Sequence, residues 1–247
     1  MQNKKYLQKN YLIWFFYFLI CFLLMASVLF IVKHIKLMSL AMNELFPRHL
    51  FLYLLIQVFI FLGTAFILKK KYKLKVFRIS KKVKPKEVLY AFLGLMAVNA
   101  FSYFFVELLG IKVSQFENLN LENLRKEPYY FLLMIAVVAP FYEEYVFRGM
   151  MLRSLWPKRE NGCKLKVLAV LSSSIMFTVF HEVGAYIPVF FLALYLSFLS
   201  LKTVSISLPI IVHSLQNFIA GIALLYDKEL LNTGLFYFNI VSFFYVV

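Results

Sequence analysis

The chain has 247 residues, of which 62% are hydrophobic and only 16% are charged, with a mean hydropathy of +0.78. A soluble domain averages roughly 45–50% apolar and 25% charged residues, so the composition excludes a soluble globule, a disordered chain and a collagen-like or disulfide-rich scaffold. The net charge of +15 would suggest nucleic acid in a soluble chain. In a membrane chain, basic loops lying against anionic lipid explain it, and no nucleic-acid partner is expected.

Eight apolar runs are long enough, or nearly long enough, to cross a bilayer, which takes about 20 helical residues. The first, residues 11–32, carries no charge and is followed by no small-residue cleavage site, so we interpret it as a retained helix rather than a signal peptide. The others are residues 51–68, 88–106, 129–152, 167–182, 186–201, 205–226 and 230–247. The sequence therefore predicts an all-α polytopic membrane protein in which about eight transmembrane helices form a single domain, residues 1–247.

Basic residues are distributed unevenly over the segments between these runs. When alternate segments are assigned to opposite sides of the membrane, 19 of the 27 Lys and Arg fall on one side and 7 on the other. Because cytoplasmic loops carry the excess of basic residues, this split predicts a cell-membrane protein with both termini in the cytoplasm. Residues 69–86 hold ten of the basic residues, and we expect this segment to bind anionic lipid at the inner leaflet.

Ionisable side chains within the apolar runs are few, and they gather in the second half of the chain. A charge in hydrocarbon is costly, so an intramembrane ionisable residue is a functional candidate by default. The candidates are Glu143, Glu144, Arg148, His181, Glu182 and His213. Their clustering indicates one site and predicts a catalytic core at about residues 129–226.

The run around Glu143 combines an expected ion pair with an acid that has no local partner. Glu144 and Arg148 are four residues apart on one helix face, in the orientation that favours an ion pair, and we assign them a structural role. Glu143 is turned about 100° away from that face. This isolation suits a general base. The alternative is that both acids simply neutralise cations between helices.

Two further pairs have the i, i+4 spacing of a shared helix face. Phe177 and His181 form the first, which predicts that the ring packs against the imidazole and holds it. His213 and Asn217 form the second, and they offer hydrogen-bond donors to the oxyanion of a tetrahedral intermediate. Interhelical hydrogen bonding, which is common for His and Asn in membranes, explains the second pair equally well. Pro209 is expected to kink the helix predicted at residues 205–226.

In this order, the motifs Glu-Glu-x-x-x-Arg, Phe-x-x-x-His and His-x-x-x-Asn resemble those of the CAAX prenyl endopeptidases and bacteriocin-processing enzymes. This family, called CPBP or Abi, consists of intramembrane proteases. Each motif alone is a weak signal, whereas three in order on three apolar runs are a strong one. The resemblance covers residues 143–217, and nothing outside them adds to it.

The resemblance implies an eight-helix fold around a water-filled cavity open to the cytoplasm, and a role for each motif residue. Glu143 with His181 would activate a water for attack on the scissile carbonyl, and His213 with Asn217 would stabilise the oxyanion. No covalent nucleophile and no cofactor are expected. The supporting residues would be Glu144, Arg148 and Phe177.

Zinc is the alternative to this metal-free mechanism. Glu143, His181 and His213 would supply a carboxylate and two imidazoles, with water as the fourth ligand. The sequence lacks the paired i, i+4 histidines of the common zinc-helix motif, which favours the metal-free mechanism. Cys21 and Cys163 lie far apart in the chain and predict neither a disulfide nor a cysteine metal site.

The predicted function is that of an intramembrane endopeptidase that cleaves a small membrane-associated peptide or a lipoprotein-like precursor. In bacteria the family that the chain resembles is linked to peptide maturation, peptide-pheromone (quorum-sensing) signalling and self-protection against bacteriocins. The alternatives are a non-proteolytic ion- or proton-coupled transporter and a bacteriocin-immunity protein that binds a partner without chemistry. A transporter would usually show polar residues on more helices or internal repeats of broken helices, and neither pattern is visible.

Overall fold

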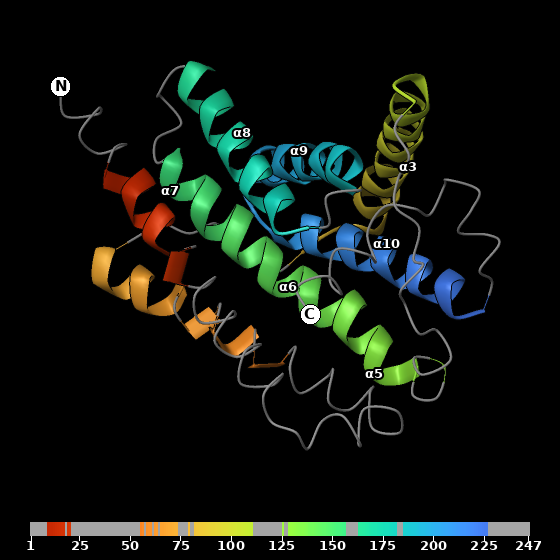
Figure 1. The fold of residues 1–247 in the computed structure, drawn as a ribbon, viewed down its shortest axis with the longest axis horizontal. Coiled ribbons are helices and arrows are strands. Elements are labelled where there is room, and N and C mark those ends of the chain that lie inside the picture. The colour runs from red at the N-terminus through yellow and green to blue at the C-terminus, as the bar shows by residue number, and fades with distance from the viewer. Residues whose placement is uncertain are drawn as a thin grey trace.

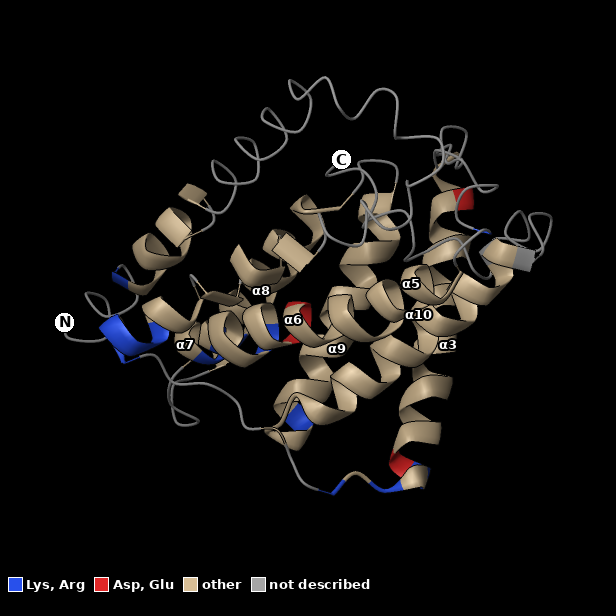
Figure 2. Ribbon diagram, turned by 90° about the horizontal axis from the view of Figure 1, so that it is seen from below, with Lys and Arg blue, Asp and Glu red and all other residues tan. Residues whose placement is uncertain are grey.

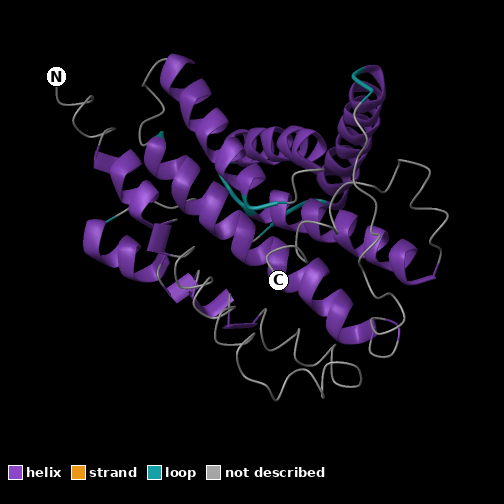
Figure 3. Cartoon of the chain, in the orientation of Figure 1, coloured by secondary structure: helices purple, strands orange, loops and turns teal. Residues whose placement is uncertain are grey.

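The computed structural model of the chain describes residues 9–17, 19–20, most of 55–73, residue 79, 82–110, 125, 128–156, 163–181 and 185–226. Within these residues every regular element is a helix, which confirms the predicted all-α class (Figures 1 and 3). Three of the features predicted from the sequence lie outside the described residues: Cys21, Glu182 and the apolar run 230–247.

The described helices from residue 85 onward follow the predicted runs to within a few residues. In chain order they are α3 (Pro85–Leu108), α5 (Pro128–Leu133), η1 (Met134–Val138), α6 (Ala139–Glu143), η2 (Glu144–Leu152), α7 (Arg153–Leu155), α8 (Cys163–Val179), α9 (Tyr186–Thr203) and α10 (Ser207–Tyr226). The elements η1 and η2 are π-helical, and the five segments from α5 to α7 form one continuous rod (Figure 1).

Three of the described helices are long and apolar enough to cross a membrane. They are α3, the rod Pro128–Leu155 and α9, and a shorter apolar stretch covers Ser207–Ala223 of α10. These helices support the membrane location predicted from composition. The count of about eight spans stays a prediction, because the runs 11–32, 51–68 and 230–247 lie partly or wholly outside the described residues.

The rod carries both glutamates and departs from a regular α-helix. At the end of η1 the N–H of Ala139 donates to the carbonyl oxygen of Met134, five residues back, which is the π-helical pattern. The second π-helical segment, η2, begins directly at Glu144. Such segments are rare and occur frequently at functional sites. Nearly all residues of η2 are buried, so this part of the rod makes contacts all round rather than along one stripe.

The helices α8, α9 and α10 pack around the rod (Figure 1). α8 packs against η2 and α9, α10 packs against η1 and α3, and α3 packs against α9. The N-terminal helical residues hold the far end of the rod, where Asn10 Nδ2 donates to the carbonyl oxygen of Ser154 (3.0 Å) and Trp14 Nε1 donates to its Oγ (2.7 Å). The segment that carries Glu143 is thereby held between elements on several sides.

Charged residues of the described chain lie mainly toward the ends of the helices (Figure 2). The exception is the group at α6 and the start of η2, where acidic and basic residues lie side by side within the helical bundle. The predicted separation of loop charges from a small intramembrane cluster is therefore visible in the fold.

The starts of α3 and α10 are set by local hydrogen bonds. The backbone N–H of Lys84 donates to Glu87 Oε2 (3.1 Å), which closes a cap just before Pro85. The N–H of Ser207 donates to Ser205 Oγ (3.2 Å) at the start of α10. Pro209 thus lies in the first helical turn, where a missing N–H leaves no helical bond unmade. The kink expected of a proline inside this helix therefore does not apply.

Gly94 of α3 allows a close approach of Tyr195 of α9. A Cβ at position 94 would collide with the Tyr195 hydroxyl, which donates to the carbonyl oxygen of Ala91 (2.7 Å). We expect Gly94→Ala to lower the free energy of unfolding by about 1–3 kcal/mol through overpacking. Tyr195→Phe removes the colliding oxygen, so Gly94→Ala should cost less in that background. Thermal unfolding of the four proteins in detergent measures this coupling, and equal costs in both backgrounds would contradict the contact.

Candidate active site

Glu144 lies at the centre of a buried polar cluster. Its Oε1 accepts hydrogen bonds from Arg148 Nη1 (2.9 Å) and from His213 Nδ1 (3.1 Å). The side chains of Glu144 and Arg148 are fully buried, and that of His213 is nearly so. The predicted Glu144–Arg148 ion pair is confirmed. The structure adds that the same carboxylate oxygen fixes a histidine from α10, so that two of the three motifs meet at one atom.

Arg148 connects the rod to α8 and α9. Its Nη2 donates to the carbonyl oxygen of Ala193 (3.4 Å), and its guanidinium carbon lies 4.0 Å from the ring centroid of Phe177. A cation above an aromatic face is attracted by the ring, most strongly where water is excluded. These contacts, together with Glu144, offset the cost of placing a charged guanidinium in the bundle.

Phe177 brings His181 to this cluster. Its ring centroid lies 4.4 Å from that of His181 and 6.2 Å from that of His213, which confirms the predicted packing of Phe177 on the imidazole. The Nδ1–H of His181 donates to the carbonyl oxygen of Phe177 (2.6 Å). Because a carbonyl oxygen only accepts, Nδ1 carries the hydrogen, and the neutral ring keeps its lone pair on Nε2. His181 therefore presents an accepting nitrogen at the half-buried edge of the cluster.

Glu143 is the carboxylate that stays partly accessible. Its side chain is 11% exposed, whereas that of Glu144 is fully buried, and its Oε2 lies 3.9 Å from His213 Nε2. This distance is too long for a direct hydrogen bond and short enough for one water to contact both atoms. His213 thus lies between two carboxylates, with Glu144 bonded to Nδ1 and Glu143 facing Nε2.

Asn217 lies one helical turn after His213 in α10 and donates a hydrogen bond to the rod. Its Nδ2 donates to the carbonyl oxygen of Ile135 (2.8 Å) in η1. In the π-helical pattern this carbonyl would accept from the residue five positions on, which is Pro140, and proline has no N–H. Asn217 therefore supplies the donor that Pro140 lacks. This is the interhelical hydrogen bond allowed by the sequence, and the second N–H of the amide is left for another acceptor.

The structural and catalytic roles of Asn217 can be separated with Pro140. Asn217→Ala should lower the free energy of unfolding by about 1–3 kcal/mol, because it leaves the buried carbonyl of Ile135 without a donor. In a Pro140→Ala background the new N–H can supply that carbonyl, and the stability cost of Asn217→Ala should shrink. Thermal unfolding and peptide cleavage of the four proteins give both readouts. Recovery of stability without recovery of cleavage is the result expected if Asn217 also contacts the oxyanion, and recovery of both would contradict that role.

One contact to the rod, made by Ser173, was not predicted from the sequence. Ser173 Oγ of α8 donates to the carbonyl oxygen of Phe147 in η2 (2.8 Å), much as Asn217 does to Ile135 in η1. In each π-helical segment, a side chain from a neighbouring helix thus donates a hydrogen bond to a backbone carbonyl oxygen. The position of Pro140 within an otherwise helical run was the sequence signal for the contact between Asn217 and Ile135. No sequence signal indicated the contact of Ser173.

The proposed zinc ligands can be tested against this geometry. Within the part of the chain that the structure describes, no group of three or more His, Cys, Asp and Glu side chains is placed to hold a metal ion. The Nδ1–H groups of His181 and His213 donate to the Phe177 carbonyl and to Glu144, so each ring presents Nε2, as metal-bound histidines also do. The metal-free mechanism therefore stays a prediction.

Comparison with known proteins points to the same segment of the chain. Residues 125–219, which contain all three motifs, match the family model of the Rce1-like type II CAAX prenyl endopeptidases. The chain is also 31% identical over 103 residues to the membrane-embedded CAAX protease MroQ of Staphylococcus aureus (strain USA300). That match covers 41% of this chain and 42% of MroQ, so it spans less than half the length of this curated relative. No solved structure matches the chain. Over residues 125–219 the chain is thus similar to the CPBP or Abi family of CAAX-protease-like membrane proteins.

Proposed function

We propose that the chain is an intramembrane endopeptidase that hydrolyses a peptide bond in a small membrane-associated peptide or precursor. The observation that carries this proposal is the pairing of a partly accessible acid with a fixed histidine. Glu143 faces His213 across 3.9 Å, while Glu144 and Arg148 hold that histidine from the buried side. The family match over residues 125–219 supports a peptidase.

Glu143 acts as the general base in this mechanism. A water that contacts Glu143 Oε2 gives a proton to the carboxylate as its oxygen attacks the scissile carbonyl carbon. The same proton then passes to the leaving amide nitrogen when the C–N bond breaks, which restores Glu143. His181 presents Nε2 as a second acceptor toward the water. No covalent intermediate forms, so one acid completes the cycle.

The negative charge that develops on the carbonyl oxygen needs donors already in position. His213 supplies one through Nε2 when the ring carries both protons, and the second N–H of Asn217 supplies another. Glu144 keeps the His213 ring oriented because Oε1 accepts from Nδ1. Arg148 and Phe177 support Glu144 and His181 from behind. Each motif residue thus has a distinct task, and only Glu143, His181, His213 and Asn217 touch reacting atoms.

The substrate class follows from the location of the site within apolar helices. A membrane-associated peptide or a lipoprotein-like precursor reaches such a site from the bilayer, and its cleavage would serve peptide maturation, peptide-pheromone signalling or bacteriocin self-immunity. Purified chain in proteoliposomes, supplied with a membrane-peptide extract, tests the proposal against its Glu143→Gln variant. New peptide termini with the wild type alone would support it. Ion flux that depends on Glu143 and His213 without any cleavage would instead identify a transporter.

An immunity protein without chemistry is separated by a cellular assay. Alanine at Glu143, His181 and His213 should abolish the phenotype that the wild type confers, because each residue takes part in the reaction. A phenotype that survives all three substitutions would indicate partner binding alone and would contradict the peptidase.

Metal removal provides a further prediction. Cleavage should persist after dialysis against a strong chelator, because in the proposed mechanism Glu143 and His181, rather than a metal ion, activate the water. Activity before and after dialysis, alongside the zinc content by mass spectrometry, gives the answer. Loss of activity that returns on adding zinc would contradict the metal-free mechanism.

A further inference from the structure

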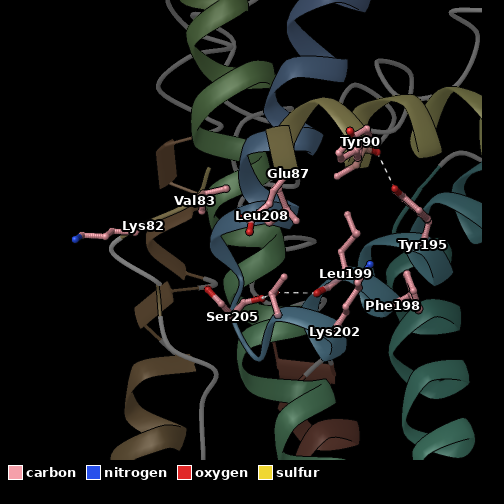
Figure 4. A pocket seen from close by; sticks show the side chains of 12 residues that line it. Lys82, Val83, Glu87, Tyr90, Tyr195, Phe198, Leu199, Lys202, Ser205 and Leu208 are labelled. Carbon is pink, nitrogen blue, oxygen red and sulfur yellow. Dashed lines mark hydrogen bonds between the residues drawn. The ribbon is translucent and has the colours of Figure 1, made fainter. Parts of the chain in front are cut away.

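A pocket separate from the candidate active site opens at the ends of three helices (Figure 4). Its volume is about 520 Å³, and its walls come from the start of α3, the last turns of α9 and the turn that leads into α10. None of the motif residues lines it. The volume falls within the range of about 300–1,000 Å³ that is typical of small-molecule sites.

One wall of the pocket is apolar and faces the outside of the bundle. Tyr90 of α3 is 70% exposed and Phe198 of α9 is 55% exposed, although both line the pocket. Leu199 and Leu208, which also line the pocket, are buried (Figure 4). In a membrane chain, exposed aromatic side chains at helix ends occupy the interface between headgroups and acyl chains. The pocket is therefore accessible from the bilayer.

The other wall is cationic. Lys202 lines the pocket with its ammonium 5.9 Å from the ring centroid of Phe198. Lys82, just before α3, also lines the pocket and extends outward (Figure 4). The N-terminus of α10, which begins beside Ser205, adds the positive end of a helix dipole. Of the described residues that line the pocket, the one acid is Glu87, whose Oε2 already accepts the N–H of Lys84.

The two lysines come from segments that the basic-residue distribution assigns to the cytoplasmic side. Lys82 belongs to the basic segment before α3, and Lys202 lies in the last turn of α9. The structure brings both segments to one pocket, so they lie on the same side of the membrane. Basic pockets between transmembrane helices on that side bind the headgroups of anionic lipids.

We propose that this pocket binds the phosphate-bearing headgroup of an anionic phospholipid. The phosphate lies between Lys202 and the start of α10, and the acyl chains leave along Tyr90 and Phe198 into the bilayer. The pocket is too small for a whole two-chain lipid, which agrees with capture of the headgroup alone. Lipid binding here does not depend on the peptidase activity proposed for the other site.

Native mass spectrometry of the detergent-solubilised full chain tests this proposal with phosphatidylglycerol and phosphatidylcholine supplied in equal amounts. We expect the wild type to retain phosphatidylglycerol preferentially. Lys202→Gln should lower the bound phosphatidylglycerol about fivefold, which is the effect of one basic residue near an anionic headgroup. Lys164→Gln is the matched control, because Lys164 is an exposed lysine at the start of α8 that does not line the pocket. Equal loss in both variants, or no preference in the wild type, would overturn the proposal.

Two further arms distinguish the source of the phosphate and the place of binding. Val83→Trp should fill the pocket and displace phosphatidylglycerol while leaving the melting temperature near that of the wild type. Retention of the lipid by this folded variant would overturn the assignment to the pocket. Inorganic phosphate at millimolar concentration should compete weakly, because it has no acyl chains for the apolar wall. Complete displacement by inorganic phosphate would show a free-phosphate site and would overturn the lipid assignment.

Discussion

Glu143→Gln should abolish peptide cleavage while the protein remains folded and inserted in the membrane. Glutamine keeps the shape of the side chain and removes the basic carboxylate, so the attacking water loses its proton acceptor. General acid–base catalysis typically contributes a factor of about 10²–10⁴, and we expect kcat/KM to fall by that amount. Because Glu143 makes no direct hydrogen bond to His213 across 3.9 Å, the melting temperature should change little.

Glu107→Gln is the matched control for this experiment. Glu107 is an exposed acid near the end of α3, far from the three motifs in the chain, and its neutralisation should leave cleavage unchanged. Retained cleavage by Glu143→Gln would remove Glu143 from the mechanism. Equal loss in both glutamine variants would indicate an effect of charge on the whole protein rather than on the site.

Arg148→Met should have the largest effect on stability. The substitution keeps an apolar side chain against Phe177, removes the Arg148 ion pair and leaves the fully buried Glu144 with His213 as its remaining described partner. Breaking a buried pair by removing one partner typically costs about 3–5 kcal/mol. Chemical or thermal unfolding in detergent measures this cost, and we expect little folded protein at 37 °C.

The double variant Glu144→Gln, Arg148→Met separates loss of the pair from loss of volume. Glutamine at 144 carries no charge, so the double variant should be more stable than Arg148→Met alone. It should remain inactive, because the glutamine at position 144 offers His213 Nδ1 a neutral amide oxygen in place of the carboxylate oxygen of Glu144. Additive costs of the two substitutions would contradict a direct coupling between Glu144 and Arg148.

The contacts that follow from helix periodicity were predictable from the sequence. The Glu144–Arg148 pair and the packing of Phe177 on His181 both follow from the i, i+4 spacing, which places two side chains on one helix face. The helix bounds were also close, since the run predicted at 88–106 corresponds to α3 at Pro85–Leu108. Local patterns of this kind need no knowledge of how the helices are arranged.

The contacts between different helices could not be predicted from the i, i+4 spacing. The bond between Glu144 and His213 joins residues 69 positions apart, and the bond between Asn217 and Ile135 joins residues 82 positions apart. Both depend on the crossing of α10 over the rod and on its π-helical segments, which hydrophobic periodicity does not indicate. The pocket proposed to bind lipid is another product of tertiary arrangement, because its walls come from three separate helix ends.

The most direct test of the central claim compares short membrane peptides, by mass spectrometry, in cells that produce the wild type or Glu143→Gln at equal levels. The account predicts at least one peptide whose mature form occurs with the wild type and whose uncleaved precursor accumulates with the variant. Identical peptide profiles in the two strains, with both proteins folded in the membrane, would contradict it.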